Sequence, residues 1–283
     1  MVRPLRRSRT RYGIVVRAVL ASLLSAPLLY GLVRPAYADV AVGAGAGDFL
    51  QFEIGGRSAG MGGAQVGSAS GVTAQFWNPA GLASLQRPQV GGMHASWLGD
   101  LKYEWIGYAR PTSLGVGSLS VSYFHMPSIA GVDEFGTPTG EFKVYDMAVT
   151  AGLSRPVGDR LSLGANAKMV RQNLATVSAT GFAVDFGAQA KGPKGVTFGA
   201  VVQNLGPSLS FDGSSYPLSR QIRFGASGEV ANGRVLLASD YNMPSDYYDD
   251  VRVGAELRAH PNVSLRVGYR QVMGEGDNPQ SGL

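Results

Sequence analysis

The stretch Leu161–Arg171, which reads LSLGANAKMVR, decides the fold because its apolar and polar residues alternate with a period of two. Successive side chains of a β-strand point to opposite faces of a sheet, so one face of this segment is mainly apolar and the other polar. The same alternation recurs in Ser118–Tyr123 and in Val263–Arg270. The pattern predicts antiparallel strands with one face towards lipid and the other towards water.

Eleven strands of this kind are expected after residue 87, with glycine, proline and asparagine between them. The turns at Pro156–Asp159 and Asn232–Gly233 are short, whereas the connections 127–141 and 206–219 are long. In outer-membrane barrels the short turns face the periplasm and the long loops the exterior. The expected strands lie near 88–98, 102–111, 116–126, 142–155, 160–174, 179–191, 194–205, 220–231, 233–243, 249–259 and 262–272.

A soluble sheet shows the same alternation, so the membrane interpretation depends on further features of the chain. No stretch after Val33 approaches the 20 or so apolar residues of a membrane-spanning helix, so a chain that spans a membrane does so with strands. Lys168, Arg266 and Arg270 are then expected to face the lumen, because a cation facing lipid near the bilayer midplane costs about 2–4 kcal/mol. The fold class predicted is all-β, a transmembrane antiparallel β-barrel. An interfacial girdle is predicted by aromatic residues near strand ends, which are Trp97, Tyr103, Trp105, Tyr123, Phe124, Tyr145, Tyr241, Tyr247, Tyr248 and Tyr269.

Residues 1–38 have the features of an export signal. An arginine-rich start precedes a largely apolar run, 15–33, and an A-x-A pattern ends at Ala38. Cleavage is therefore expected between Ala38 and Asp39. An uncleaved transmembrane helix is the alternative, but Arg17 interrupts the apolar run. The general secretory pathway is expected, because the residues around the paired arginines match the twin-arginine pattern poorly.

The basic character of the whole chain comes from this signal. Seven of the 25 basic residues and none of the 20 acidic ones lie in 1–38, so the remainder carries 18 basic and 20 acidic residues, a formal charge of −2. No basic patch supports a nucleic-acid partner. The chain has no cysteine, which excludes disulfides, thiolate metal sites and cysteine nucleophiles.

Residues 39–86 are expected to form a hatch inside the barrel, 87–283. Glycines in the hatch permit positive φ angles and close backbone approach. Asn78 is expected to cap a turn through its side chain, and Pro79 to fix φ before a short helical or bent exit. The candidate gating residues are Gly60, Met61, Gly62, Gly63 and Ala64, then Asn78, Pro79, Ala80 and Gly81.

No catalytic site, metal or cofactor is expected. Gly60–Gly63 lacks the lysine, strand and helix of a phosphate loop. His94, His125 and His260 are far apart in the sequence and have no nucleophile or ligand spacing around them. The acidic residues Asp246, Asp249 and Asp250 suit a solvated turn better than a calcium site, because the EF-hand spacing is missing.

Several motifs in order resemble the PorV/PorQ-like outer-membrane proteins, which are related in architecture to the FadL-type transporters. The most specific are Arg57–Ala64, Trp77–Ala83, Leu163–Lys168 and Val201–Pro207; the weaker ones are Tyr216–Leu218, Val253–Glu256 and Leu265–Tyr269. The resemblance implies a barrel of about fourteen strands with an N-terminal hatch, in the outer membrane of a Gram-negative-type bacterium.

The chain departs from this family in two places. Ser219 stands where the family often has a second proline. The expected strand count is odd, and the sequence stops in a turn at Gln280–Leu283, so the chain is expected to lack closing strands at its C-terminus.

Two functions follow from the resemblance. The PorV side implies a component of type IX-like protein secretion that receives exported cargo and works with other secretion components. The FadL side implies a passive transporter of hydrophobic small molecules, with the hatch gating entry. A structural barrel without a transport role is the third possibility. An apolar pocket above the hatch would favour lipophilic ligands, and a polar, plugged lumen with an adhesive outer loop would favour protein cargo.

Overall fold

A computed structural model describes residues 45–97 and 100–273. The predicted signal, its cleavage site at Ala38 and Asp39, the first residues of the predicted hatch and the expected C-terminal truncation fall outside these residues. Nearly all regular structure is β-strand, and the all-β prediction is confirmed.

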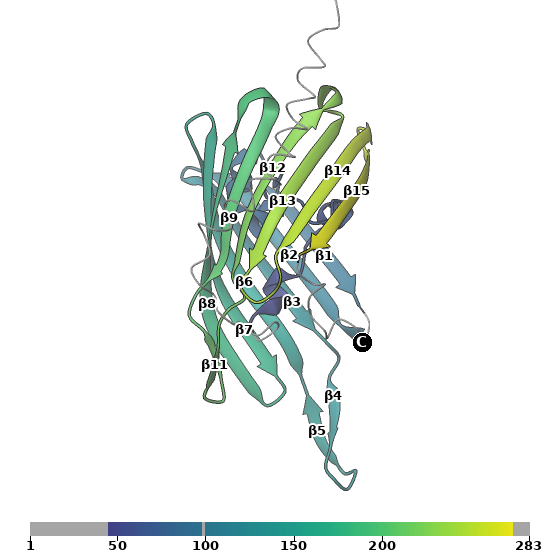
Figure 1. Cartoon of the computed structure of the whole chain (residues 1–283). Helices are drawn as coiled ribbons and strands as arrows, with labels where there is room; N and C mark the ends of the chain where they lie inside the picture. The colour runs from purple at the N-terminus through teal and green to yellow at the C-terminus, as the bar shows by residue number, and fades with distance from the viewer. Residues whose placement is uncertain (1–44, 98–99, 274–283) are drawn as a thin grey trace, which may run out of the picture.

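The main element is an eleven-stranded antiparallel sheet that curls around the hatch (Figure 1). Its strands follow one another in sequence order, and each matches one of the eleven expected strands. They are β1 (Gln89–Ser96), β2 (Lys102–Thr112), β3 (Gly115–His125), β6 (Val144–Val157), β7 (Leu161–Leu174), β8 (Val177–Lys191), β9 (Val196–Leu205), β12 (Gln221–Val230), β13 (Val235–Pro244), β14 (Asp250–His260) and β15 (Val263–Val272). Within the described residues, β1 and β15 are the two edges of this sheet.

The two longest connections contain strands that were expected to be loops. One forms the hairpin β4 (Ile129–Val132) and β5 (Pro138–Phe142), and the other the hairpin β10 (Leu209–Phe211) and β11 (Ser214–Tyr216). Both project from the same end of the sheet, which we call the long-loop end (Figure 1). The opposite, short-turn end has tight connections, two of which contain the 3₁₀ turns η4 (Pro193–Gly195) and η5 (Ala231–Gly233).

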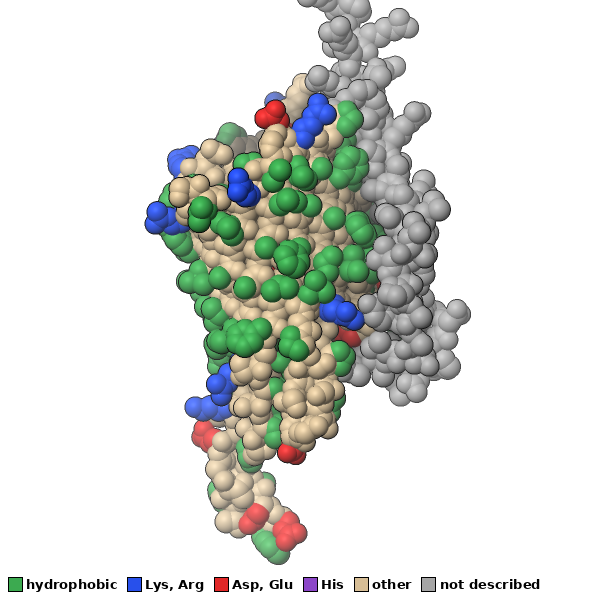
Figure 2. Space-filling view, turned by 90° about the vertical axis from the view of Figure 1, so that its left-hand side faces the viewer, with side chains coloured by type: hydrophobic (Ala, Val, Ile, Leu, Met, Phe, Trp, Pro, Cys, Tyr) green, Lys and Arg blue, Asp and Glu red, His purple; other side chains and the backbone are tan. Residues whose placement is uncertain are grey.

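In strand β7 the alternating residues point to the two opposite faces of the sheet. Gly164, Asn166 and Lys168 are buried on the inner face, whereas Leu163 and Met169 are exposed on the outer face. Lys168 therefore faces the lumen as predicted, and Arg266 and Arg270 also point inward, onto Glu256 and Asp250. Figure 2 shows hydrophobic side chains spread over the outer face, and charged ones mostly towards its two ends.

The prediction of an aromatic girdle is only partly right. Tyr123 and Tyr145 lie on the outer face, with ring centroids 5.8 Å apart. Tyr103, Trp105 and Tyr241, in contrast, are buried inside the barrel. The inward face of β2 is apolar because it packs against the hatch rather than against water. In the part of the chain that is described, no helix is long and apolar enough to cross a bilayer.

Candidate functional site: the hatch and its seat

The hatch, residues 45–86 of the described chain, crosses the lumen in four short helical segments. These are η1 (Asp48–Gln51), α2 (Gly56–Gly60), α3 (Ala74–Trp77) and η2 (Pro79–Ser84). The segment begins near the long-loop end, where Ala46 forms a parallel bridge with Leu218. Gly62 and Gly63 adopt φ angles of 61° and 78°, which glycine tolerates without strain and which reverse the chain after α2.

The hatch packs against inward-facing glycines of the barrel wall, and we call these glycines the glycine seat. A Cβ at Gly164 would fall on the backbone of Pro79 and Ala80, and one at Gly268 on the backbone of Met61 and Gly62. A Cβ at Gly254 would lie 2.5 Å from the Met61 carbonyl oxygen. Because these positions lack side chains, the hatch backbone lies directly against the sheet. The seat consists of Gly164, Gly187, Gly199, Gly225, Gly254 and Gly268.

The two halves of the predicted gating motif occupy different parts of this seat. Met61 and Ala64 are fully buried, and Met61 lies against β14 and β15. Asn78 and Pro79 lie against Gly187 of β8. The structure therefore does not bring the two halves together into one pocket, although an Asn78 hydrogen bond to Val66 links their neighbourhoods.

Asn78 caps the turn as predicted. Its Oδ1 accepts a hydrogen bond from the Ala80 N–H at 3.1 Å, at the start of η2. Its Nδ2 donates to the carbonyl oxygens of Val66 and Ala188, both at 3.0 Å. The side chain is completely buried. One amide thus joins the hatch to itself and to β8.

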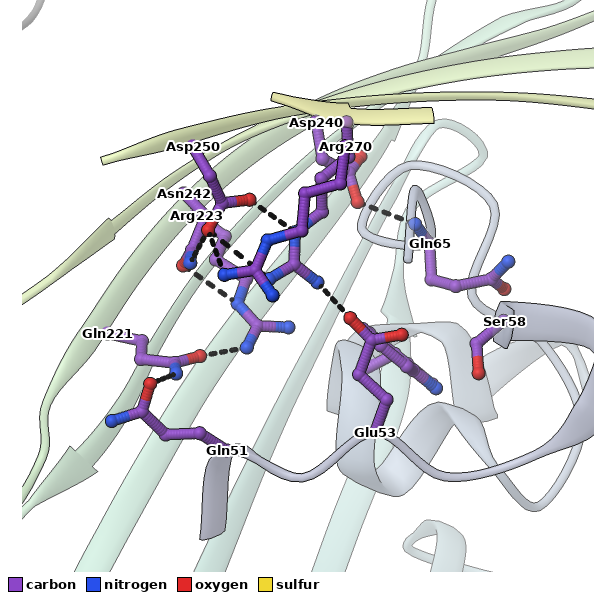
Figure 3. A network of polar contacts seen from close by, with 12 residues as sticks. Gln51, Glu53, Ser58, Gln65, Gln221, Arg223, Asp240, Asn242, Asp250 and Arg270 are labelled. Atoms are coloured by element: carbon purple, nitrogen blue, oxygen red, sulfur yellow. Dashed lines mark hydrogen bonds and ion pairs between the residues drawn. The ribbon is translucent and has the colours of Figure 1, made fainter. Parts of the chain in front are cut away.

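Charged side chains fasten the hatch to the β12–β15 wall (Figure 3). Glu53 Oε1 lies 2.6 Å from Arg252 Nη1, and Arg57 Nε lies 2.9 Å from Glu256 Oε2. Asp240 accepts hydrogen bonds from the backbone N–H groups of Gln65, at 2.5 Å, and Val66, at 2.8 Å. Buried carboxylates and guanidinium groups are tolerated here because each has partners of opposite charge or backbone donors.

This network continues within the wall. Asp250 pairs with Arg252 at 2.5 Å and with Arg270 at 2.9 Å, and it accepts a hydrogen bond from Asn242. Arg223 donates to Asn242 and Gln221, and its guanidinium lies 5.4 Å from the centroid of the Trp77 ring in the hatch.

A second polar cluster joins two of the motifs that carried the family resemblance. Lys168, from Leu163–Lys168, donates to Asn204, from Val201–Pro207, at 2.7 Å. Asp185 lies between them: it pairs with Lys168 at 2.9 Å and accepts from the Asn204 N–H at 2.9 Å. The sequence did not identify Asp185, because nothing local shows that an aspartate on β8 lies diagonally across from a lysine on β7.

The β1–β3 wall meets the hatch differently, mainly through apolar side chains. Ile54, Val72, Trp77 and Leu82 of the hatch pack with buried residues of these strands. Towards the long-loop end, four aromatic rings meet inside the barrel: Phe52, Trp97, Tyr103 and Phe124. The centroids of Phe52 and Trp97 are 4.9 Å apart, and Trp97 is 43% exposed. We call these four residues the aromatic cluster.

On the other side of the hatch, a cavity of about 1510 Å³ opens at the short-turn end. The hatch contributes Ser68–Ser70 and Ala83–Ser84 to its lining, and the turns contribute Arg160, Lys191 and Asn232. We call it the vestibule. The hatch thus separates an aromatic surface at one end from the vestibule at the other.

The acidic residues expected on a solvated turn are instead buried, which corrects that interpretation. Asp246 accepts from Gln51 of the hatch, Asp249 from the Tyr241 hydroxyl, and Asp250 belongs to the ion-pair network. Within 45–97 and 100–273, no group of three or more residues suited to a metal is found.

At the long-loop end, Ser219 Oγ lies within hydrogen-bond distance of carboxylate oxygens of both Asp48 and Asp246, and it can donate its single proton to one of them at a time. Burial, assisted by the neighbouring Asp246 charge and opposed by the Ser219 hydrogen bond, raises the pKa of Asp48.

Two of the histidines are also closer than the sequence suggested. His94 and His125 flank Glu104 on the outer face, with nitrogen-to-oxygen distances of 3.0 and 3.8 Å. Antiparallel pairing of β1, β2 and β3 brings them there.

The glycine seat gives a direct prediction. Gly199→Val is expected to push the hatch off β9, because its added side chain would occupy the position of the Val66 carbonyl. The measurement is limited trypsin cleavage at Arg57, which should become faster. Gly92→Val is the control, since a Cβ there lies 3.7 Å from its nearest neighbour. Equal cleavage of the two variants would contradict this role of the seat.

Comparisons with known proteins agree with this architecture. Several solved structures share the fold. The Ralstonia pickettii toluene transporter TbuX has 16% identity and a TM-score of 0.53 over 77% of this chain and 86% of that one. The CymD monoaromatic hydrocarbon channel has 15% identity and a TM-score of 0.54 over 85% and 86%. The P. putida toluene transporter TodX has 15% identity and a TM-score of 0.54 over 77% and 83%. These likenesses show that the chain shares the fold of these proteins.

No curated protein matches the sequence. The sequence model described as Uncharacterised protein family (UPF0164) matches residues 40–206, which include the described hatch and the strands from β1 to β9. The match covers more than half of the chain, and the chain therefore belongs to the UPF0164 family.

Proposed function

We propose that this protein is an outer-membrane barrel through which hydrophobic small molecules pass, with the hatch as the gate. The observation that carries the proposal is the aromatic cluster, which presents Trp97 at the long-loop end and leads to Phe52 of the hatch. Aromatic rings bind apolar ligands through their large surfaces, and a partly exposed set inside a barrel mouth suits a first contact.

Three further observations support this proposal. The fold is shared with proteins described as toluene transporters and a monoaromatic hydrocarbon channel. The outer face carries the exposed apolar residues that lipid requires. The vestibule lies beyond the hatch and offers an aqueous exit. Export by the general secretory pathway fits the N-terminal signal.

The test is uptake by liposomes that contain the purified protein. Hydrophobic compounds of graded size should enter faster than into empty liposomes, whereas glucose should not. Phe52→Ala and Trp97→Ala should slow this uptake, and Phe135→Ala, in the β4–β5 hairpin, should leave it unchanged. Uptake no faster than in empty liposomes across the whole panel would overturn the proposal.

The contacts of the hatch indicate which side of it opens. Ion pairs hold the hatch to the β12–β15 wall, and the glycine seat holds it to β7–β9 as well as to that wall. Against β1–β3 the hatch packs mainly through apolar side chains and makes no ion pair among the described residues, although the Val72 N–H donates a hydrogen bond to Gln89 of β1. Apolar contacts can be replaced by an apolar ligand without leaving a buried charge unpaired. The ligand is therefore expected to pass between the hatch and β1–β3.

Engineered disulfides test this route without interference, because the chain has no cysteine. Val72 Cγ1 lies 2.7 Å from where a Cβ of Gly91 would be, so Val72→Cys with Gly91→Cys should link the hatch to β1. Oxidation should stop uptake and reduction should restore it. Val66→Cys with Gly225→Cys places the two Cβ positions 3.0 Å apart on the β12 side. Because any side chain at this seat glycine also displaces Asp240, the comparison is between the oxidised and reduced forms of the same variant, and these two forms should take up ligand at equal rates. The opposite pattern would place the route along the β12 side.

A secretion component of the PorV/PorQ type is the second candidate, with exported cargo and other secretion components as its partners. The β4–β5 hairpin favours it, because the hairpin projects away from the barrel and its tip residue Phe135 is 85% exposed. Asp133 fixes this tip by accepting hydrogen bonds from the Phe135 and Thr137 N–H groups. Co-purification with exported proteins that share a C-terminal domain, lost when residues 130–141 are deleted, would favour this function. Unchanged export in a strain without the gene would exclude it.

A further inference from the structure

Two arginines lie close together on the outer face near the short-turn end. Arg110 of β2 and Arg155 of β6 are both exposed and both point away from the lumen. In the strand register Arg110 is opposite Gly117 of β3, and Gly117 is opposite Leu153 of β6. Arg155 is two residues beyond Leu153, so its Cα lies on the order of 12 Å from that of Arg110, given the usual strand spacings.

Gly117 leaves a hollow between these arginines. It sits on the outer face of the strand between theirs, and a Cβ there would meet only Thr112 Cγ2, at 3.7 Å. The two long side chains can therefore reach over the glycine towards a common group. A larger residue at this position would occupy that space.

Neither arginine has an acidic partner within residues 45–97 and 100–273. The ion pairs of the wall, such as Arg252 with Asp250, use other arginines, and neither Arg110 nor Arg155 makes a hydrogen bond through its guanidinium there. Asp159 follows Arg155 on the β6–β7 turn but forms no ion pair with it. Two cations without a carboxylate partner at this spacing attract an anion.

Apolar side chains surround the pair. Leu114 lies on the β2–β3 turn, Leu119 and Leu153 lie further along the strands, and Val157 ends β6; all four are exposed. In a membrane these residues would contact acyl chains, and the arginines would lie at the level of the headgroups. A ligand that fits both parts has a hydrocarbon tail and an anionic head.

We propose that Arg110, Arg155 and the hollow at Gly117 form a binding site for the phosphate group of an anionic phospholipid in the leaflet at the short-turn end. The guanidinium fork matches phosphate oxygens in bidentate geometry, which a lysine cannot reproduce. The site would hold a bound lipid against β2, β3 and β6. This inference depends on the membrane location in the proposed function, but not on transport.

The experiment measures bound lipid by native mass spectrometry after purified protein is mixed with equal amounts of phosphatidylglycerol and phosphatidylcholine with the same acyl chains. The native protein should retain phosphatidylglycerol preferentially. Arg110→Gln with Arg155→Gln should reduce this preference roughly tenfold or more, as expected for the loss of two basic residues near a lipid surface. Gly117→Leu should reduce it while keeping both charges.

The matched control is Arg171→Gln, because Arg171 is also exposed and outward-facing but lies towards the long-loop end of β7. This variant should retain the preference. Equal preference in the native and double-glutamine proteins would overturn the inference, as would displacement of the lipid by inorganic phosphate alone. A protein that fails to enter liposomes would instead contradict the proposed membrane function, so the two failures are distinguishable.

Discussion

Replacing Asp185 with leucine is expected to destabilise the barrel by about 3–5 kcal/mol, the usual cost of leaving one buried charge without its partner. The Lys168 and Asp185 side chains are only 8% and 0% exposed, and their charged atoms are 2.9 Å apart. The substitution would leave the lysine with the neutral Asn204 alone. It would also remove the acceptor for the Asn204 N–H and for the Asn166 side chain. Urea unfolding in detergent measures the loss.

A double-mutant cycle separates the unpaired charge from other effects of the substitution. Lys168→Met removes the cation, so the combination of Lys168→Met and Asp185→Leu should be more stable than Asp185→Leu alone. Recovery will be partial, because the Asn204 N–H still lacks its acceptor. If the stability lost in the double variant equalled the sum of the losses in the two single variants, the two side chains would not interact. That result would contradict this account of the cluster.

The strands could be predicted from the sequence because their pattern is local. A period of two is visible within ten residues, and it also assigns Lys168 to the inner face. The fold adds information where distant segments meet. Glu53 pairs with Arg252, 199 residues away, and no local sequence pattern predicts that contact. The ion pairs that hold the hatch therefore could not be predicted.

The hatch also explains why some side chains were assigned to the wrong environment. A water-filled lumen would make every inward face polar, but here the hatch fills it. Tyr103 and Trp105 are inward because they pack on that filling, while Lys102 and Arg110 at the strand ends face outward. Asp246 and Asp250 are buried because hatch and wall residues supply their partners. Gly164, Gly254 and Gly268 of the seat lie in motifs that carried the family resemblance, but the sequence did not show that they contact the hatch, since a glycine in a strand is also compatible with a bulge.

Asn78→Ala is expected to loosen the hatch and to lower the stability of the protein by about 2–4 kcal/mol, because it removes a helix cap and leaves buried backbone groups unsatisfied. The Ala80 N–H would lose its acceptor, and the carbonyls of Val66 and Ala188 would lose a donor. Loosening should appear as faster trypsin cleavage at Arg57 and as larger or more frequent conductance openings in planar bilayers.

Two further variants distinguish the cap from the link to the wall. Ser84→Ala, at the other end of η2, removes a single local hydrogen bond to Gly81 and should change both readouts little. Asn78→Ser keeps an oxygen for the cap but is too short to reach Ala188, so it should fold better than the alanine variant and still show increased conductance. If the conductance of Asn78→Ser were as low as that of the native protein, the cap alone would hold the hatch in place. If Asn78→Ala were native in stability, cleavage and conductance, this residue would have no part in gating. We expect Asn78→Ser to lie between the native protein and Asn78→Ala in stability and to show increased conductance. The reason is that the Asn78 amide both stabilises the turn and links that turn to the barrel wall.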